Sequence, residues 1–302
     1  MMSLQARTMK MPLFNSPQAA FCTCLPKYNI NTYLGRCIHH CIYCYAVKFP
    51  SFAGPATPHL KVFDQIEDMA KNTKTKLPVM LSDCTDPYQP LESEVKITRK
   101  CADILAGHNF PLLIVTKSNL VVRDMDIFKK TSTVVAITVT TLREDVARII
   151  EPQAPPPQRR IAAVKEMAEQ GIWTVARIDP ILPTINDDET GFEKLVSTLA
   201  DAGAKQITVA TMKPVKGFFT TLKMKNSKTY DGLVNAYADG KWIMGYKYLD
   251  KKRRWEILEK LRPIVLRHCL DFASCREGFS ELNTTLCDGT AHLRCLIDNY
   301  LT

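Results

Sequence analysis

Strand-like and helix-like segments alternate along residues 29–212, and this alternation constrains the fold more than any other feature of the sequence. Short aliphatic, β-branched runs predict six strands, at residues 29–34, 78–82, 112–116, 134–140, 173–178 and 206–210. Helical periodicity between them predicts helices at residues 61–71, 93–106, 124–130, 156–170 and 188–202, with Ser93 as a suitable N-cap. Such alternation is typical of a parallel sheet curled into all or part of a barrel. We therefore expect an α/β fold with its site at the carboxyl ends of the strands.

Three cysteines lie within eight residues, just after the first predicted strand. Cys37, Cys41 and Cys44 are separated by three and then two residues, so one loop can aim three thiolates at one point. Thiolates select zinc, copper(I) or iron–sulfur clusters. A structural zinc site needs four ligands, and beyond the single CxxC pair the only nearby donors are His39 and His40 of the same loop. The spacing therefore favours a 4Fe–4S cluster with one open iron, and zinc is the alternative.

The CxxxCxxC spacing, with the aromatic Tyr43 before the last cysteine, resembles the signature of the radical S-adenosylmethionine (radical SAM) superfamily. A longer resemblance points to its spore photoproduct lyase-related branch, and it is carried by residues 31–37, 41–46, 85–92, 116–118, 151–152 and 180–183. The resemblance implies a partial (β/α)6 barrel of TIM type. It also implies a 4Fe–4S cluster, S-adenosylmethionine as cofactor and a reducing partner such as flavodoxin or ferredoxin. Cleavage of the cofactor would give a 5′-deoxyadenosyl radical that abstracts hydrogen from a substrate, with nucleic acid as one candidate.

Polar residues at the predicted strand ends are the candidates for binding the cofactor: Ser82, Asp83, Lys117, Thr138, Thr140 and Arg177. The resemblance implies that the segment after the second strand binds the cofactor amino group, that Lys117 pairs with its carboxylate and that Thr138 lies near the ribose. Tyr43 is expected to pack against the cluster and shield it. Cys84 lies where the lyase carries its hydrogen-donating cysteine, so it is a candidate catalytic residue. A buried, inert thiol is the other interpretation of Cys84.

Charge and cysteine content set the C-terminal part of the chain apart. The predicted organisation is an N-terminal extension at 1–28, the core at 29–212 and a basic, cysteine-containing extension at 213–302. Residues 213–254 carry nine lysines and two arginines against three aspartates, in a chain of net charge +9, with aromatic residues interspersed. This composition suits DNA or RNA, or else a solvated edge above packed aromatics. Cys275, Cys287 and Cys295 are candidates for an auxiliary metal, or for reduced structural thiols. Cys22 and Cys24 are too isolated in the sequence to interpret.

The remaining composition bounds the setting of the protein. No run of 18 apolar residues is present, so we expect no membrane span, and the first residues lack the apolar core of a signal peptide. A cytoplasmic location is therefore expected, where the eleven cysteines stay reduced. Two further functions stay open: an iron–sulfur or zinc nucleic-acid-binding protein without radical catalysis, and a radical SAM enzyme acting on a peptide or small molecule.

Overall fold

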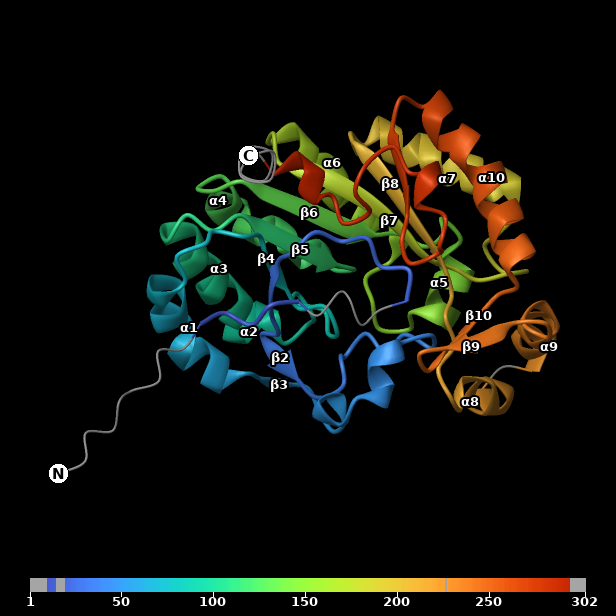
Figure 1. The fold of residues 1–302 in the computed structure, drawn as a ribbon, viewed down its shortest axis with the longest axis horizontal. Coiled ribbons are helices and arrows are strands. Elements are labelled where there is room, and N and C mark those ends of the chain that lie inside the picture. Colours follow the sequence, from blue (N-terminus) through green and yellow to red (C-terminus); the bar gives the residue numbers. More distant parts are fainter. Residues whose placement is uncertain (1–9, 15–19, 226, 294–302) are drawn as a thin grey trace.

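A seven-stranded parallel sheet forms the centre of the molecule (Figure 1). The computed structural model describes residues 10–14, 20–225 and 227–293. Within them the sheet strands follow chain order: β1 (Tyr28–Ile30), β4 (Val79–Leu81), β5 (Leu112–Thr116), β6 (Thr133–Thr138), β7 (Trp173–Ile181), β8 (Gln206–Thr211) and β11 (Asp271–Ser274). Every neighbouring pair is parallel. This is the predicted partial barrel, with β11 as a seventh strand that the sequence did not reveal.

Helices pack on one face of this sheet and form the main hydrophobic core. The longer helices are α1 (Leu60–Asn72), α3 (Ile97–Gly107), α6 (Pro157–Glu169), α7 (Glu189–Asp201) and α10 (Lys251–Arg267). Alternate strand residues point toward them, so Val79 and Leu81 of β4, like Leu112 and Ile114 of β5, are fully buried in that core. The two-residue period of a strand sends the residues between them to the opposite face.

The opposite, concave face of the sheet is covered by the two ends of the described chain. Met80, Leu113 and Val175 point to this face, where they share a small core with Phe14 and Leu293. The C-terminal segment approaches the sheet closely at Gly289. A Cβ on this residue would lie 2.7 Å from a Val175 methyl carbon, and its φ is +79°. Only glycine suits both conditions. N-terminal and C-terminal residues therefore meet inside the barrel.

The second predicted helix is interrupted. It consists of α2 (Glu92–Val95) and α3, with Lys96 between them in the left-handed conformation at φ 55°. Ser93 is not the cap, because its hydroxyl donates to the Pro90 carbonyl oxygen. The Glu92 carboxylate takes that role by accepting the backbone N–H groups of Thr98 at 3.0 Å and Arg99 at 3.1 Å.

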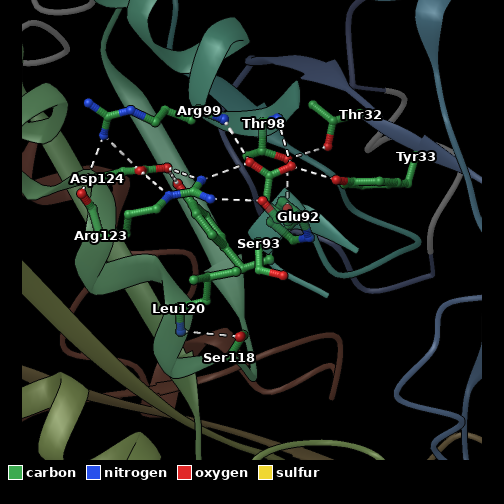
Figure 2. Close-up of polar contacts among 12 residues, drawn as sticks. Thr32, Tyr33, Glu92, Ser93, Thr98, Arg99, Ser118, Leu120, Arg123 and Asp124 are labelled. Atoms are coloured by element: carbon green, nitrogen blue, oxygen red, sulfur yellow. Dashed lines mark hydrogen bonds and ion pairs between the residues drawn. The ribbon is translucent and has the colours of Figure 1, made fainter. Parts of the chain in front are cut away.

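Glu92 is also the centre of a buried polar network (Figure 2). Its carboxylate accepts a hydrogen bond from the Tyr33 hydroxyl at 2.5 Å and from the Arg123 guanidinium at 2.8 Å. Tyr33 belongs to β2 (Tyr33–Leu34), which leads directly into the cysteine loop, and Arg123 belongs to the 3-10 helix Asn119–Asp124. The network thus ties the start of the cysteine loop to the outer layer of the barrel.

The other elements are shorter and lie around the rim or at the C-terminal side. They are β3 (Thr57–Pro58), α4 (Met125–Phe128), α5 (Glu144–Ile150), α8 (Phe218–Lys225), α9 (Ser227–Ala236), β9 (Lys241–Ile243) and β10 (Tyr246–Tyr248), with 3-10 helices at Tyr45–Lys48, Pro50–Phe52, Ser280–Leu282 and Thr290–His292. β2 pairs with β3 and β9 pairs with β10, both in antiparallel fashion. In the described part of the chain, no helix has the length and apolar character needed to cross a membrane.

Candidate active site

The cysteine loop is held by backbone contacts on both sides. Gly35, which precedes it, has φ of +73°, and a Cβ there would lie 1.9 Å from a backbone oxygen, so only glycine fits. Within the loop, the Ile38 N–H donates to the Gln89 side-chain oxygen at 3.0 Å. The Ile42 N–H donates to the Ile150 carbonyl oxygen at 2.9 Å. The loop is therefore fixed to the segment after β4 and to the end of α5.

Cys37, Cys41 and Cys44 border one cavity of about 140 Å³. The rest of its wall comes from the same loop and from the carboxyl ends of β4, β5 and β6: His39, Tyr43, Tyr45, Ser82, Asp83, Cys84, Thr85, Asp86, Val115, Thr116, Lys117 and Thr138. The three thiols are free. Among the described residues, no three His, Cys, Asp or Glu side chains are arranged to hold a single metal ion.

The loop thiols have the chemistry of metal ligands. Burial raises the pKa of Cys37 to about 12, and it raises the pKa of Cys41 as well. These thiols are therefore protonated on their own, and a metal centre that binds them would displace their protons and stabilise the thiolates. Three thiolates at one end of a cavity fit a 4Fe–4S cluster whose fourth iron is left for a small molecule.

Asp86 connects the cysteine loop to the end of β5. One carboxylate oxygen lies 3.2 Å from His39 Nε2 and accepts the Lys117 N–H at 2.6 Å. The other accepts the Thr116 hydroxyl at 2.6 Å and the Tyr88 N–H at 2.8 Å. Burial alone would raise the pKa of Asp86, but the facing His39 and these hydrogen bonds lower it to about 2. Asp86 therefore stays charged and fixes the backbone from which Lys117 projects.

Lys117 lies among acidic and aromatic groups. Its Nζ is 5.5 Å from the centre of the Tyr43 ring, and the Tyr43 hydroxyl donates a hydrogen bond to Glu151. Glu151 is fully buried and also pairs with Arg160 at 2.5 Å. Burial opposes protonation of Lys117, but Cys41 in its thiolate form and the Glu151 carboxylate outweigh it and raise the Lys117 pKa. The ammonium group is therefore available to bind a carboxylate.

A larger cavity of about 300 Å³ adjoins the first. Six residues border both cavities: Tyr43, Tyr45, Asp83, Val115, Lys117 and Thr138. Around the larger cavity, cations outnumber acids: Lys27, Lys117, Arg177, Lys213 and Arg276 against Asp83, Asp179 and Asp288. Two ion pairs form between these lining residues, Lys27 with Asp288 at 2.7 Å and Arg177 with Asp179 at 2.5 Å. Because Lys213 also pairs with Glu277, Lys117 and Arg276 are the lining cations best placed to face a polar substrate that carries negative charge.

The predicted cofactor residues differ in where the structure places them. Asp83, Lys117 and Thr138 border both cavities, whereas Ser82 borders the smaller one and Arg177 the larger one. The Ser82 hydroxyl is already bound to the Thr32 backbone N–H at 3.2 Å.

Thr140 borders neither of these two cavities. It is buried beyond the end of β6, where its carbonyl oxygen accepts the Asn186 side-chain N–H at 2.8 Å. The structure therefore does not bring Thr140 to the predicted cofactor site.

Cys84 borders the smaller cavity and not the larger one. Burial and the neighbouring Asp83 raise the pKa of its thiol, and the nearby Tyr45 hydroxyl donates to the Asp83 carbonyl oxygen at 2.5 Å. Cys84 is therefore a protonated thiol beside the cysteine loop. That state suits a hydrogen-atom donor and a fixed structural thiol equally well.

The basic C-terminal segment is less free for nucleic acid than its composition indicated. Arg254 is 5% exposed and donates to the Leu249 carbonyl oxygen at 3.1 Å, so it belongs to the interior. Lys213 pairs with the buried Glu277 at 2.6 Å. Among the described aromatic side chains of residues 213–255, Trp242 alone is exposed. The lysines that remain open to solvent include Lys216, Lys241, Lys251 and Lys252.

Cys22 and Cys24, which the sequence left without an interpretation, lie near Cys275 and Cys287, the candidates for an auxiliary metal. Cys24 Sγ is 4.0 Å from Cys287 Sγ, across 263 positions of the chain. Both border the larger cavity, as does Cys275. Cys295, which was grouped with Cys275 and Cys287, lies outside the described residues. No spacing rule could have joined Cys24 to Cys287, because their proximity follows from the meeting of the chain ends inside the barrel.

Comparison with known proteins places these features in a family. The family model of the radical SAM superfamily matches residues 32–204, more than half of the chain. An uncharacterized protein of Methanocaldococcus jannaschii is 37% identical over 167 residues, which cover 54% of this chain and 63% of that protein. The radical SAM Nalpha-GlyT isomerase of Pseudomonas phage M6 is 24% identical over 183 residues, 59% of this chain and 38% of the isomerase. The chain thus spans less than two thirds of the length of either relative.

Solved structures show the same fold. A spore photoproduct lyase mutant has a TM-score of 0.69 at 17% identity, with 89% of this chain and 79% of the lyase covered. Another mutant of that lyase, with bound AdoMet and dinucleoside spore photoproduct, has a TM-score of 0.68 at the same identity and coverage. At 17% identity this likeness establishes a common architecture.

Proposed function

The chain belongs to the radical SAM superfamily and is an enzyme of that type, and we propose that Cys37, Cys41 and Cys44 hold a 4Fe–4S cluster that serves S-adenosylmethionine cleavage. When bound, the cluster supplies the electron that cleaves the cofactor to methionine and a 5′-deoxyadenosyl radical, which takes a hydrogen atom from the substrate. One observation carries the proposal: the three loop thiols and Lys117 border a single cavity that adjoins a larger one.

The residues around the two cavities bind and orient the cofactor in this proposal. The Lys117 ammonium, held protonated between Cys41 and Glu151, pairs with the cofactor carboxylate. Asp83 accepts hydrogen bonds from the amino group, and Thr138, which like Asp83 borders both cavities, contacts the ribose. Tyr43, tied to Glu151, shields the cluster side from water.

The substrate proposed for the larger cavity is a nucleotide unit, free or within a nucleic acid. Its support is the excess of cations around about 300 Å³ of space, together with the relationship to a fold that in the spore photoproduct lyase accommodates a dinucleoside. A peptide or another small anionic molecule is the second candidate, because the segment 213–255 offers a single exposed aromatic among its described residues. We place the reaction in the cytoplasm, with flavodoxin or ferredoxin as the electron donor.

The test is reductive cleavage of the cofactor. Anaerobically reconstituted protein, given dithionite and S-adenosylmethionine, is expected to release 5′-deoxyadenosine and methionine, measured by chromatography. The triple variant Cys37→Ala/Cys41→Ala/Cys44→Ala should release neither. Cys269→Ala, which removes an exposed cysteine, should behave as wild type. Wild-type protein with a full cluster and no cleavage would favour an iron–sulfur or zinc nucleic-acid-binding protein without radical catalysis.

A further inference from the structure

Four cysteines from the two ends of the described chain meet beside the larger cavity. Cys22 and Cys24 lie in the irregular segment before β1, Cys275 directly follows β11, and Cys287 lies in the loop before Thr290. All four are free thiols. They are separate from the loop Cys37–Cys44, which is the first cysteine group of the molecule.

The four sulfurs form one connected row. Cys24 Sγ lies 4.0 Å from Cys287 Sγ. Cys22 lies within interaction range of Cys24 at one end of this pair, and Cys275 lies within interaction range of Cys287 at the other end. Each thiol is only a weak hydrogen-bond donor. Hydrogen bonding therefore gives little reason for four thiols to lie together, whereas a shared ligand would.

The spacing suits metal coordination by thiolates. With Zn–S bonds of about 2.3 Å, a tetrahedral site has sulfurs about 3.8 Å apart, which is close to the 4.0 Å between Cys24 and Cys287. As they stand, the four are not gathered around one point, so coordination requires the outer thiols to turn inward. Cys22 can turn because residues 22–27 have no regular secondary structure.

The surrounding charges favour thiolates at this position. Lys27 is buried, lies within interaction range of Cys24 and donates to Asp288 at 2.7 Å, and Arg177 lies near Cys275 while donating to the Cys287 carbonyl oxygen at 3.4 Å. The acidic neighbours Asp288 and Asp179 pair with these two cations. Four thiolates around a divalent ion carry two negative charges, and the two cations, because they also pair with these carboxylates, offset part of the cost of burying them.

We propose that Cys22, Cys24, Cys275 and Cys287 form a second metal centre, coordinated by four thiolates, that joins the N-terminal segment to the C-terminal loop on the concave face of the sheet. The ligand is a thiophilic metal, either a single zinc ion or an iron–sulfur cluster. Three of the four side chains border the larger cavity, so the centre also forms part of its wall. It stabilises the same juncture that Phe14 and Leu293 cover with apolar contacts.

The experiment uses the triple variant Cys37→Ala/Cys41→Ala/Cys44→Ala, in which the loop holds no metal. Its outcome is therefore independent of whether the radical chemistry proposed above is correct. The full-length variant is purified anaerobically, reconstituted separately with zinc and with iron plus sulfide, and analysed by metal quantification and X-ray absorption. We expect either about one zinc with four sulfur ligands or an iron–sulfur cluster with thiolate ligands.

Matched variants assign the metal to these four residues. Adding Cys24→Ser and Cys287→Ser to the triple variant should remove the metal, whereas adding Cys269→Ser should leave it in place. If the serine variants fail to fold, the folded triple variant is titrated with cobalt(II). The intensity of the sulfur-to-cobalt charge-transfer absorption then reports how many thiolates bind the metal. Absence of thiolate-bound metal in the triple variant would overturn the proposal. So would metal that survives the loss of Cys24 and Cys287, or a disulfide between them in the anaerobic protein.

Discussion

Asp86→Asn tests whether the carboxylate between the cysteine loop and β5 carries the charge that the structure assigns to it. The pKa of Asp86 is lowered from its usual 3.8 to about 2. At about 1.4 kcal/mol for each pKa unit, ionised Asp86 stabilises the folded protein by roughly 2 kcal/mol at neutral pH. Asparagine keeps the shape but loses this contribution, and its amide nitrogen faces donors such as the Lys117 N–H, 2.6 Å from the carboxylate.

The pH dependence gives the sign of the effect. Because the folded-state pKa lies below the unfolded one, the stabilisation is complete well above pH 4 and disappears as the pH falls toward 2. At pH 3 about half of it should remain, so the wild-type advantage over Asp86→Asn should shrink to about 1 kcal/mol.

Urea unfolding of reduced, metal-free protein at pH 7 and pH 3 measures this difference. Asp103→Asn is the control, since Asp103 makes an exposed pair with Lys130 and should cost less than about 1 kcal/mol. Equal stability of the two variants at pH 7, or an Asp86→Asn defect that does not decrease at pH 3, would refute the assigned role of Asp86.

Three further substitutions test the buried Glu92 network, the role of Cys84 and the exposed lysines. Glu92→Gln removes one of the two buried carboxylates that pair with Arg123, the other being Asp124, and should cost about 3 kcal/mol in urea unfolding. Glu94→Gln, at an exposed position, should cost almost nothing. Similar values for both variants would contradict the network of Figure 2. Cys84→Ala should keep iron content and 5′-deoxyadenosine release while changing the distribution of products, and a loss of iron would instead make Cys84 a fourth ligand. If the exposed lysines contact phosphates, Lys251→Gln/Lys252→Gln should reduce the slope of the logarithm of nucleic-acid affinity against the logarithm of salt concentration by roughly 1.5. Lys165→Gln is the control. An unchanged slope would favour a peptide or small-molecule substrate.

The central architecture was predictable because its signals are local. A buried parallel strand is a short aliphatic run, and β4, β5, β6, β7 and β8 all coincide with predicted runs to within a few residues. The position of the cysteine loop at the carboxyl end of the sheet followed from the same alternation. β11 was missed because its four residues, Asp271–Ser274, are too few to show a strand period and follow a helix in a cysteine-containing tail.

Contacts made by side chains across the fold were less predictable. Ser93 is a common capping residue, yet the cap comes from Glu92, because a buried carboxylate can bind two helix N–H groups and Arg123 together. Asp86 had the local appearance of a turn residue, and its partners His39 and Lys117 are distant in sequence.

The basic segment shows the limit of composition as a guide to function. Arg254 counts toward its charge but lies in the interior, and Tyr246 and Tyr248 count toward its aromatic content but are buried. An acidic partner for Lys117 was predictable because an ionised side chain at the buried end of a parallel strand needs one, and the structure supplies Glu151. The role of Lys117 in binding the cofactor stays a prediction.

Electron paramagnetic resonance of the reduced cluster shows whether one of its irons is open to the cofactor. The dithionite-reduced, anaerobically reconstituted protein is measured with and without S-adenosylmethionine. Binding of the cofactor to the iron that Cys37, Cys41 and Cys44 leave free should change the spectrum of the reduced cluster, and the change should be lost or weakened in Lys117→Met. A spectrum that is identical with and without cofactor, or a colourless protein with one zinc bound by the loop, would contradict the account.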